Sequence, residues 1–125
     1  MRALQIGVCS WSLQQADIRS AIEVARQELG LELIQLGFFD ESVMDASNDE
    51  RVLRAVEDSG IEVSATCVGF AGEDYSSIEA IARTGGYRPD AEFEARLAKT
   101  LRVRDLTAAL GVRMMTTHIG FVPED

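Results

Sequence analysis

The sequence has 125 residues, of which 46% are hydrophobic. This is enough apolar material for one core and too little for two. Its 12 basic and 21 acidic side chains give a net charge of -9, which repels phosphate and so argues against a nucleic-acid or membrane-surface partner. No apolar run of ~18 residues could cross a membrane, and no export signal precedes the first polar residues. We therefore expect a soluble, cytoplasmic protein of one domain or part of one.

The two cysteines, Cys9 and Cys67, both lie in apolar runs typical of strands. Neither belongs to a Cys-x-x-Cys pair or lies near the single histidine, His118, in the sequence. We expect buried, reduced thiols in preference to a disulfide or a metal site.

Apolar runs typical of strands alternate along the chain with segments of helical spacing. Residues 4–11 predict a first strand with two unequal faces. A helix is expected over 18–29, capped by Asp17 and ended by Gly30. The next apolar run, 31–39, predicts the second strand.

The second helix is predicted to begin at the capping box Ser47-Asn48-Asp49-Glu50 and to end at Gly60. A third strand is expected over 61–70. A long excursion over 71–89 follows it and holds a short helical patch. Because loops at the carboxyl ends of strands form ligand sites in α/β folds, we expect this excursion to be functional.

A long helix is predicted over 91–110, closed by Gly111, before a fourth strand over 112–119. This helix has two apolar faces, which suggest that it contacts both the sheet and another neighbour. The first face carries Phe93, Leu97, Leu101 and Ala108, and the second carries Val103, Leu106 and Leu110.

Four strands alternating with three helices predict a parallel sheet with right-handed crossovers. The first strand lacks the G-x-G-x-x-G of nucleotide-binding open sheets. Polar residues within strands fit the interior of a barrel, but they also occur in open sheets near a ligand crevice. The two architectures therefore stay open, with the barrel slightly ahead. The polar residues are Gln5, Gln35, Thr66 and Thr116.

Four motifs stand at or after the expected strand ends, namely Gly7–Leu13, Val68–Tyr75, Thr84–Asp90 and His118–Glu124. Together they resemble the amino-terminal half of sugar phosphate isomerases/epimerases of the xylose isomerase-like TIM-barrel superfamily. The resemblance covers nearly the whole chain. It implies that residues 1–125 form a single partial domain, the N-terminal half of a TIM (β/α)8 barrel that ends after strand 4, with an insertion at about 71–89.

The resemblance also implies that a sugar or sugar phosphate binds at the carboxyl ends of the strands. A divalent metal (Mn, Mg, Co or Zn) would polarise the sugar oxygens while carboxylates move a proton at the adjacent carbon. In that family the metal ligands come from later strands, and a full barrel needs ~250 residues. We therefore expect no metal site in this chain, with His118 at most one ligand, and no turnover by the chain alone.

His118 is the candidate catalytic residue, because an unperturbed pKa of ~6.5 suits proton exchange near neutrality. It is also a candidate substrate contact, together with Gly120 of the same motif. The alternative is a strand-end histidine hydrogen-bonded to a backbone carbonyl. Trp11 and Phe70 are expected to stack on the apolar face of a sugar, or else to cover the core.

Arg88 is the candidate contact for an anionic substrate. With the amides of Gly85 and Gly86 it could wrap a phosphate, although a plain turn explains the same residues. The neighbouring Glu73, Asp74 and Tyr75 form a polar cluster that we expect to be a solvated loop.

Three functions are considered. The first is part of a metal-dependent isomerase or epimerase, with a C-terminal half-barrel supplying the metal and the acid/base pair. The second is a non-catalytic, self-assembling half-barrel, in which a second copy pairs with the free edges of strands one and four. The third, an endonuclease IV-like nuclease, needs several histidines for zinc and a basic groove for DNA. One histidine and a net charge of -9 fit neither requirement.

Overall fold

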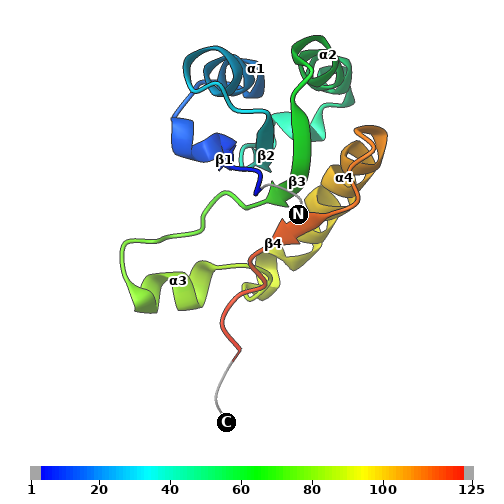
Figure 1. The fold of residues 1–125 in the computed structure, drawn as a ribbon. Coiled ribbons are helices and arrows are strands. Elements are labelled where there is room, and N and C mark those ends of the chain that lie inside the picture. Colours follow the sequence, from blue (N-terminus) through cyan, green and yellow to red (C-terminus); the bar gives the residue numbers. More distant parts are fainter. Residues whose placement is uncertain (1–3, 123–125) are drawn as a thin grey trace.

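The computed structural model describes residues 4–122 and contains one four-stranded sheet. All strands are parallel and lie side by side in the order of the sequence (Figure 1). A doubly wound sheet reverses its strand order, whereas a (β/α)8 barrel does not. The expected half-barrel architecture is therefore confirmed. The strands are β1 (Gly7–Cys9), β2 (Leu33–Phe38), β3 (Glu62–Val68) and β4 (Met115–Thr117).

The strands are shorter than their apolar runs. The end of the first run forms a 3-10 helix, η1 (Ser10–Leu13), and Ile6 before β1 is 75% exposed. In the described chain β1 pairs with β2 alone and β4 with β3 alone. A single neighbour supports fewer ladder bonds, so these two edge strands each have three residues.

The first helix begins where expected. The Ser20 amide donates to Asp17 Oδ1 at 2.8 Å ahead of α1 (Ile18–Glu23), and this bond holds the pKa of the Asp17 carboxyl below its usual value. The helix continues through a π-helical stretch, η2 (Val24–Glu28). Gly30 then turns the chain with a φ of 64°.

The predicted capping box of the second helix is wrong. Ser47 lies in a separate 3-10 turn, η4 (Ala46–Asn48), because the carboxylate of Asp45 accepts its amide at 2.9 Å. Helix α2 (Asp49–Ser59) starts directly after this turn without a side-chain cap. Gly60 ends it with a φ of 64°, as predicted.

The core lies between the sheet and the helices. Ile34, Leu36 and Phe38 alternate along β2 and are all buried on the helical side. They pack with Ile22 of the first helix and Val103 of the last. The other side chains of β2 point to the inner face, which is the interior side of a barrel.

The last helix is α4 (Phe93–Ala109). Of its two predicted apolar faces, the first is not the one that it buries. Phe93 and Leu101 remain 41% and 43% exposed. Arg96 and Lys99 are buried instead, at 4% and 2% exposure, in line with the predicted second face. Hydrophobic periodicity could not reveal this, because a cation is buried when the fold supplies it with acceptors. The buried residues are Arg96, Lys99, Val103, Leu106 and Thr107.

Thr66 does not face the interior of the barrel, contrary to the sequence prediction. It is fully buried on the helical side, with its Oγ1 2.7 Å from Thr107 Oγ1 of α4. The Thr107 hydroxyl also donates to the Val103 carbonyl at 2.6 Å. A hydroxyl placed against a helix thus has a partner there that the strand pattern does not show.

Replacing Thr66 with valine should lower the free energy of unfolding by about 1 kcal/mol, since one buried hydrogen bond is lost and the Thr107 hydroxyl keeps its second partner. Thr117→Val is the matched control. Among residues 4–122 the buried Thr117 hydroxyl has no hydrogen-bond partner, so this substitution should be neutral or stabilising. Urea denaturation measures both, and an equal loss in the two variants would contradict the assignment.

Candidate functional site

A polar ladder crosses the inner face of the sheet. The Cys9 thiol donates to Gln35 Oε1 at 3.5 Å, and Gln35 Nε2 donates to Thr116 Oγ1 at 3.0 Å. The Thr116 hydroxyl donates on to the Thr66 carbonyl at 3.2 Å. Gln35 and Thr116 therefore lie in the interior as predicted, whereas Gln5 is exposed ahead of β1. Both cysteines are free thiols, but they are half-buried and not fully buried as expected.

An aromatic corner lies at the carboxyl ends of β1 and β2. The rings of Trp11 and Phe39 are 5.2 Å apart and meet edge to face at 87°. They are 40% and 39% exposed. A cavity of about 230 Å³ adjoins both rings. The structure thus places Trp11 in η1, directly after β1, at the carboxyl ends of the strands, and adds Phe39, which sequence reasoning did not single out.

Two glycines make room for the Phe39 ring. A Cβ at Gly37 would lie 2.5 Å from Phe39 and 2.6 Å from Trp11. A Cβ at Gly69 would also collide with the Phe39 ring. Glycine at neighbouring inward positions of β2 and at the end of β3, next to an aromatic residue, is the sequence signal that could have found this corner.

Phe70 takes the second of the two roles considered for it. Its ring is only 7% exposed. The Arg96 guanidinium lies 5.2 Å from the ring centroid, and Tyr87 packs edge-on at 5.2 Å. The aromatic ring after β3 therefore belongs to the core and is not open to a substrate.

His118 directly follows β4 and is exposed. Its ring packs edge-on to Phe121 at 6.0 Å, and its Cε1 would lie 3.3 Å from a Cβ at Gly85. Within residues 4–122 no hydrogen bond to the imidazole is found, so the structure does not have the alternative in which a carbonyl holds the ring. The catalytic and substrate-binding roles of His118 stay predictions.

The turn that contains Arg88 joins the excursion to the end of β4. The Gly86 amide donates to Glu73 at 2.7 Å, and the Tyr87 amide donates to the Ile119 carbonyl at 3.1 Å. The Arg88 guanidinium donates to the Phe121 carbonyl at 2.9 Å. The Gly85 amide also has an acceptor, the Ile81 carbonyl at 2.8 Å, so the geometry is that of the plain turn. Arg88 as a substrate contact stays a prediction.

Gly120 permits the close approach between this turn and the chain after β4. Its φ is 103°, and a Cβ there would lie 2.8 Å from the Gly85 carbonyl oxygen. Both the conformation and the space favour glycine. This is a packing role, and whether Gly120 also contacts a substrate is a prediction.

Glu73 is not the solvated loop residue that we expected. It is half-buried, and its carboxylate accepts the Phe70 amide at 3.2 Å as well as the Gly86 amide. It thereby links the beginning of the excursion to its end. Tyr75 is 68% exposed. Desolvation raises the pKa of Tyr75, and the nearby Glu73 carboxylate adds to this effect.

Arg96 holds the same excursion from α4. Its guanidinium donates to the Thr84 carbonyl at 2.7 Å, to the Ala71 carbonyl at 3.4 Å and to the Gly86 carbonyl. It also pairs with Glu92 one turn earlier. The excursion with its helix α3 (Ile78–Thr84) extends away from the sheet (Figure 1). The two ends of the excursion are therefore held by hydrogen bonds, while its outer part projects from the sheet.

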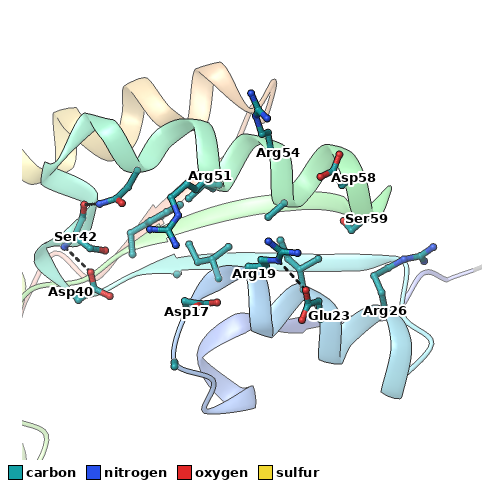
Figure 2. A pocket seen from close by; sticks show the side chains of 18 of the residues that line it. Asp17, Arg19, Glu23, Arg26, Asp40, Ser42, Arg51, Arg54, Asp58 and Ser59 are labelled. Atoms are coloured by element: carbon teal, nitrogen blue, oxygen red, sulfur yellow. Dashed lines mark hydrogen bonds and ion pairs between the residues drawn. The ribbon is translucent and has the colours of Figure 1, made fainter.

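A larger groove lies on the opposite, helical side, between α1 and α2 (Figure 2). Its volume is about 1040 Å³. Arginine and carboxylate side chains balance one another around it, and Arg19 pairs with Glu23 at 3.0 Å. Because of this balance, the groove favours neither an anionic nor a cationic ligand. The charged side chains are Asp17, Arg19, Glu23, Arg26, Asp40, Arg51, Arg54 and Asp58.

The described residues do not fit a divalent metal by themselves. Across residues 4–122 no three histidine, cysteine, aspartate or glutamate side chains cluster closely enough to hold one. The inner face offers a thiol, an amide and a hydroxyl in the ladder, which lack the charge that Mg²⁺ or Mn²⁺ prefers. His118 could add at most one ligand to a set supplied from elsewhere.

Replacing Arg96 with methionine should loosen the excursion, because three carbonyls lose their donor. Cleavage by trypsin after the exposed Arg83 should become faster, and the free energy of unfolding should fall by about 1.5–3 kcal/mol, the usual value for a hydrogen bond to a charged group. Arg104→Met, an exposed arginine of the same helix paired with Asp105 at 2.7 Å, is the control. If both variants are cut at the unmodified rate, Arg96 does not anchor the excursion.

No protein-family model matches the sequence, and no curated protein matches it significantly. Among solved structures, the chain is similar to a xylose isomerase domain protein from Planctomyces limnophilus, with 26% sequence identity and a TM-score of 0.77. The match covers 97% of this chain and 41% of that protein. No helix in the described part of the chain is long and apolar enough to cross a membrane. This chain thus has the fold of a xylose isomerase-like TIM barrel, of which it forms a partial half.

Proposed function

We propose that this chain is the substrate-binding part of a divalent-metal-dependent sugar or sugar phosphate isomerase or epimerase. The supporting observation is its match, over 97% of its length, to the xylose isomerase domain protein. Because the chain spans about two fifths of that protein, the activity of a whole barrel is part of the proposal. The reaction would be proton transfer next to a carbonyl.

The residues at the carboxyl ends of the strands divide the work. Trp11 contacts the apolar face of the sugar, and the ladder of Cys9, Gln35 and Thr116 offers hydrogen-bond partners below it. His118, exposed at the end of β4, carries a proton to or from a sugar oxygen. Gly120, two residues after His118, and Arg88, whose Cβ would lie 3.5 Å from a Cβ at Gly120, contact the charged end of a phosphorylated substrate.

The metal in this proposal has its ligands outside this chain. Mn²⁺, Mg²⁺, Co²⁺ or Zn²⁺ would polarise the sugar oxygens when bound. The side chains of the described residues provide substrate contacts and one imidazole. A C-terminal half-barrel is the expected source of the ligands and of the carboxylates that move the proton.

The isolated chain should bind sugar without converting it. The chain has a single tryptophan and a single histidine, so the side-chain NMR signals of Trp11 and His118 are identified by residue type alone. Titration with D-xylose or D-fructose 6-phosphate should shift both signals. A His118→Gln variant should keep the Trp11 shift. Isomerisation by the chain alone with Mn²⁺, Mg²⁺ or Co²⁺ would show that it is more than a binding part. Unmoved signals with both sugars would overturn the proposal.

A second candidate, the non-catalytic self-assembling half-barrel, is favoured by the exposed sheet edges. In the described chain β1 and β4 each have one neighbour. Ile6 beside β1 is 75% exposed and Met114 beside β4 is 59% exposed. A second copy could pair its β4 with this β1 and its β1 with this β4, closing a ring by a two-fold axis.

For this second candidate, native mass spectrometry should find a dimer. Ile6→Lys should weaken the dimer by about tenfold or more, because a charge replaces an apolar side chain that is worth roughly 1.5–3 kcal/mol when buried. Ile78→Lys, at an equally exposed position (73%) on α3, should leave it unchanged. A folded monomer with a sharp unfolding transition would rule the ring out.

A further inference from the structure

Phe38 and Phe39 are adjacent but have opposite environments. Phe38 ends β2 and is 5% exposed in the core. Phe39 turns to the inner face, lies over Gly37 and Gly69 and remains 39% exposed. With Trp11 it forms an aromatic surface that the described residues leave half open. Two rings at 87° make a corner, in which one ring can stack on a flat ligand face while the other meets its edge.

The backbone of Phe39 is held from the far side of the sheet. The ammonium of Lys99 on α4 donates to the Phe39 carbonyl at 2.8 Å and to Glu41 Oε1 at 3.1 Å. Lys99 is the only lysine in the sequence, and it is 2% exposed. Burying an ammonium is costly unless acceptors surround it. Its position therefore depends on the chain following β2 keeping this path.

The segment after Phe39 is fixed by a second contact. The Asp40 carboxylate accepts the Ser42 amide at 2.7 Å and caps a short 3-10 helix, η3 (Glu41–Met44). Lys99 and this cap thus hold the carbonyl of Phe39 on one side and the following turn on the other. With its backbone fixed and glycines beneath its ring, Phe39 has little freedom to leave the corner.

We propose that Phe39 is a second aromatic contact for the sugar and that Lys99 is the positioning residue that keeps it in place. This inference rests on the proposed function. The sequence predicted Trp11 and Phe70 as the aromatic sugar contacts, and Phe70 is buried in the core. The ligand that fits is a sugar whose ring or chain presents an apolar C–H face to Trp11 and an edge to Phe39. Lys99 acts through the backbone of Phe39 and does not touch the sugar.

The positioning can be tested without any ligand. Trp11 is the only tryptophan, so its fluorescence reports on its contact with Phe39. Phe39→Leu and Lys99→Met should both make Trp11 more accessible to acrylamide, while Lys99→Arg, which keeps a cationic donor, should restore the original quenching. If Lys99→Met does not fold, Lys99→Gln should show the same change in weaker form. A folded variant without Lys99 whose Trp11 quenching is unaltered would overturn the positioning role.

The sugar contact is tested by titrating the same variants with D-xylose and following Trp11 fluorescence. Phe39→Leu and Lys99→Met should weaken binding roughly three- to tenfold, which corresponds to the loss of one aromatic contact. Phe93→Leu, a 41% exposed aromatic residue on α4, is the control and should bind as the unmodified chain does. Equal affinity in all variants overturns the role of Phe39. No response of the unmodified chain overturns the proposed function and the sugar contact together, whereas the quenching experiment still decides the role of Lys99.

Discussion

The carboxyl end of this sheet depends on two cations that α4 buries. Arg96 donates to carbonyls at both ends of the excursion after β3, and Lys99 donates to the carbonyl of Phe39, directly after β2. Neither side chain is stable in the interior without those acceptors, and the carbonyls would lose their donors without the cations. One helix on the outer face therefore sets the path of two loops at the mouth of the inner face.

The two faces of the sheet differ in chemistry for a physical reason. The helical face is apolar, apart from hydroxyls and cations that have partners, as Thr66 has with Thr107. The inner face carries the ladder of Cys9, Gln35 and Thr116 and the open corner of Trp11 and Phe39. A polar interior with exposed rings suits a site that binds a polyhydroxylated ligand, and it also leaves surface for another half-barrel to cover.

Glycines do much of the shaping at this end. Gly37 and Gly69 leave the space that the Phe39 ring fills, and Gly86 and Gly120 let the turn after α3 lie against the chain after β4. Each of these positions brings a backbone close to a ring or to another backbone. A side chain at any of these positions would collide with the Phe39 ring or with the neighbouring backbone. The shape of this end of the sheet therefore depends on the absence of a Cβ atom there.

The sequence by itself determined the order of strands and helices, the glycine helix ends, the inward Gln35 and Thr116, and the resemblance to a xylose isomerase-like barrel. The elements and their ends follow from local periodicity and turn chemistry, which neighbouring residues decide, whereas the resemblance rests on the four motifs at the strand ends. Only the tertiary structure decided that Thr66 faces a helix, that Phe70 is buried while Phe39 is open, and that Glu73, Arg96 and Lys99 have buried or half-buried partners. The reason is that burial of a polar or charged group depends on acceptors and donors that the fold brings from distant segments, and no local pattern records them.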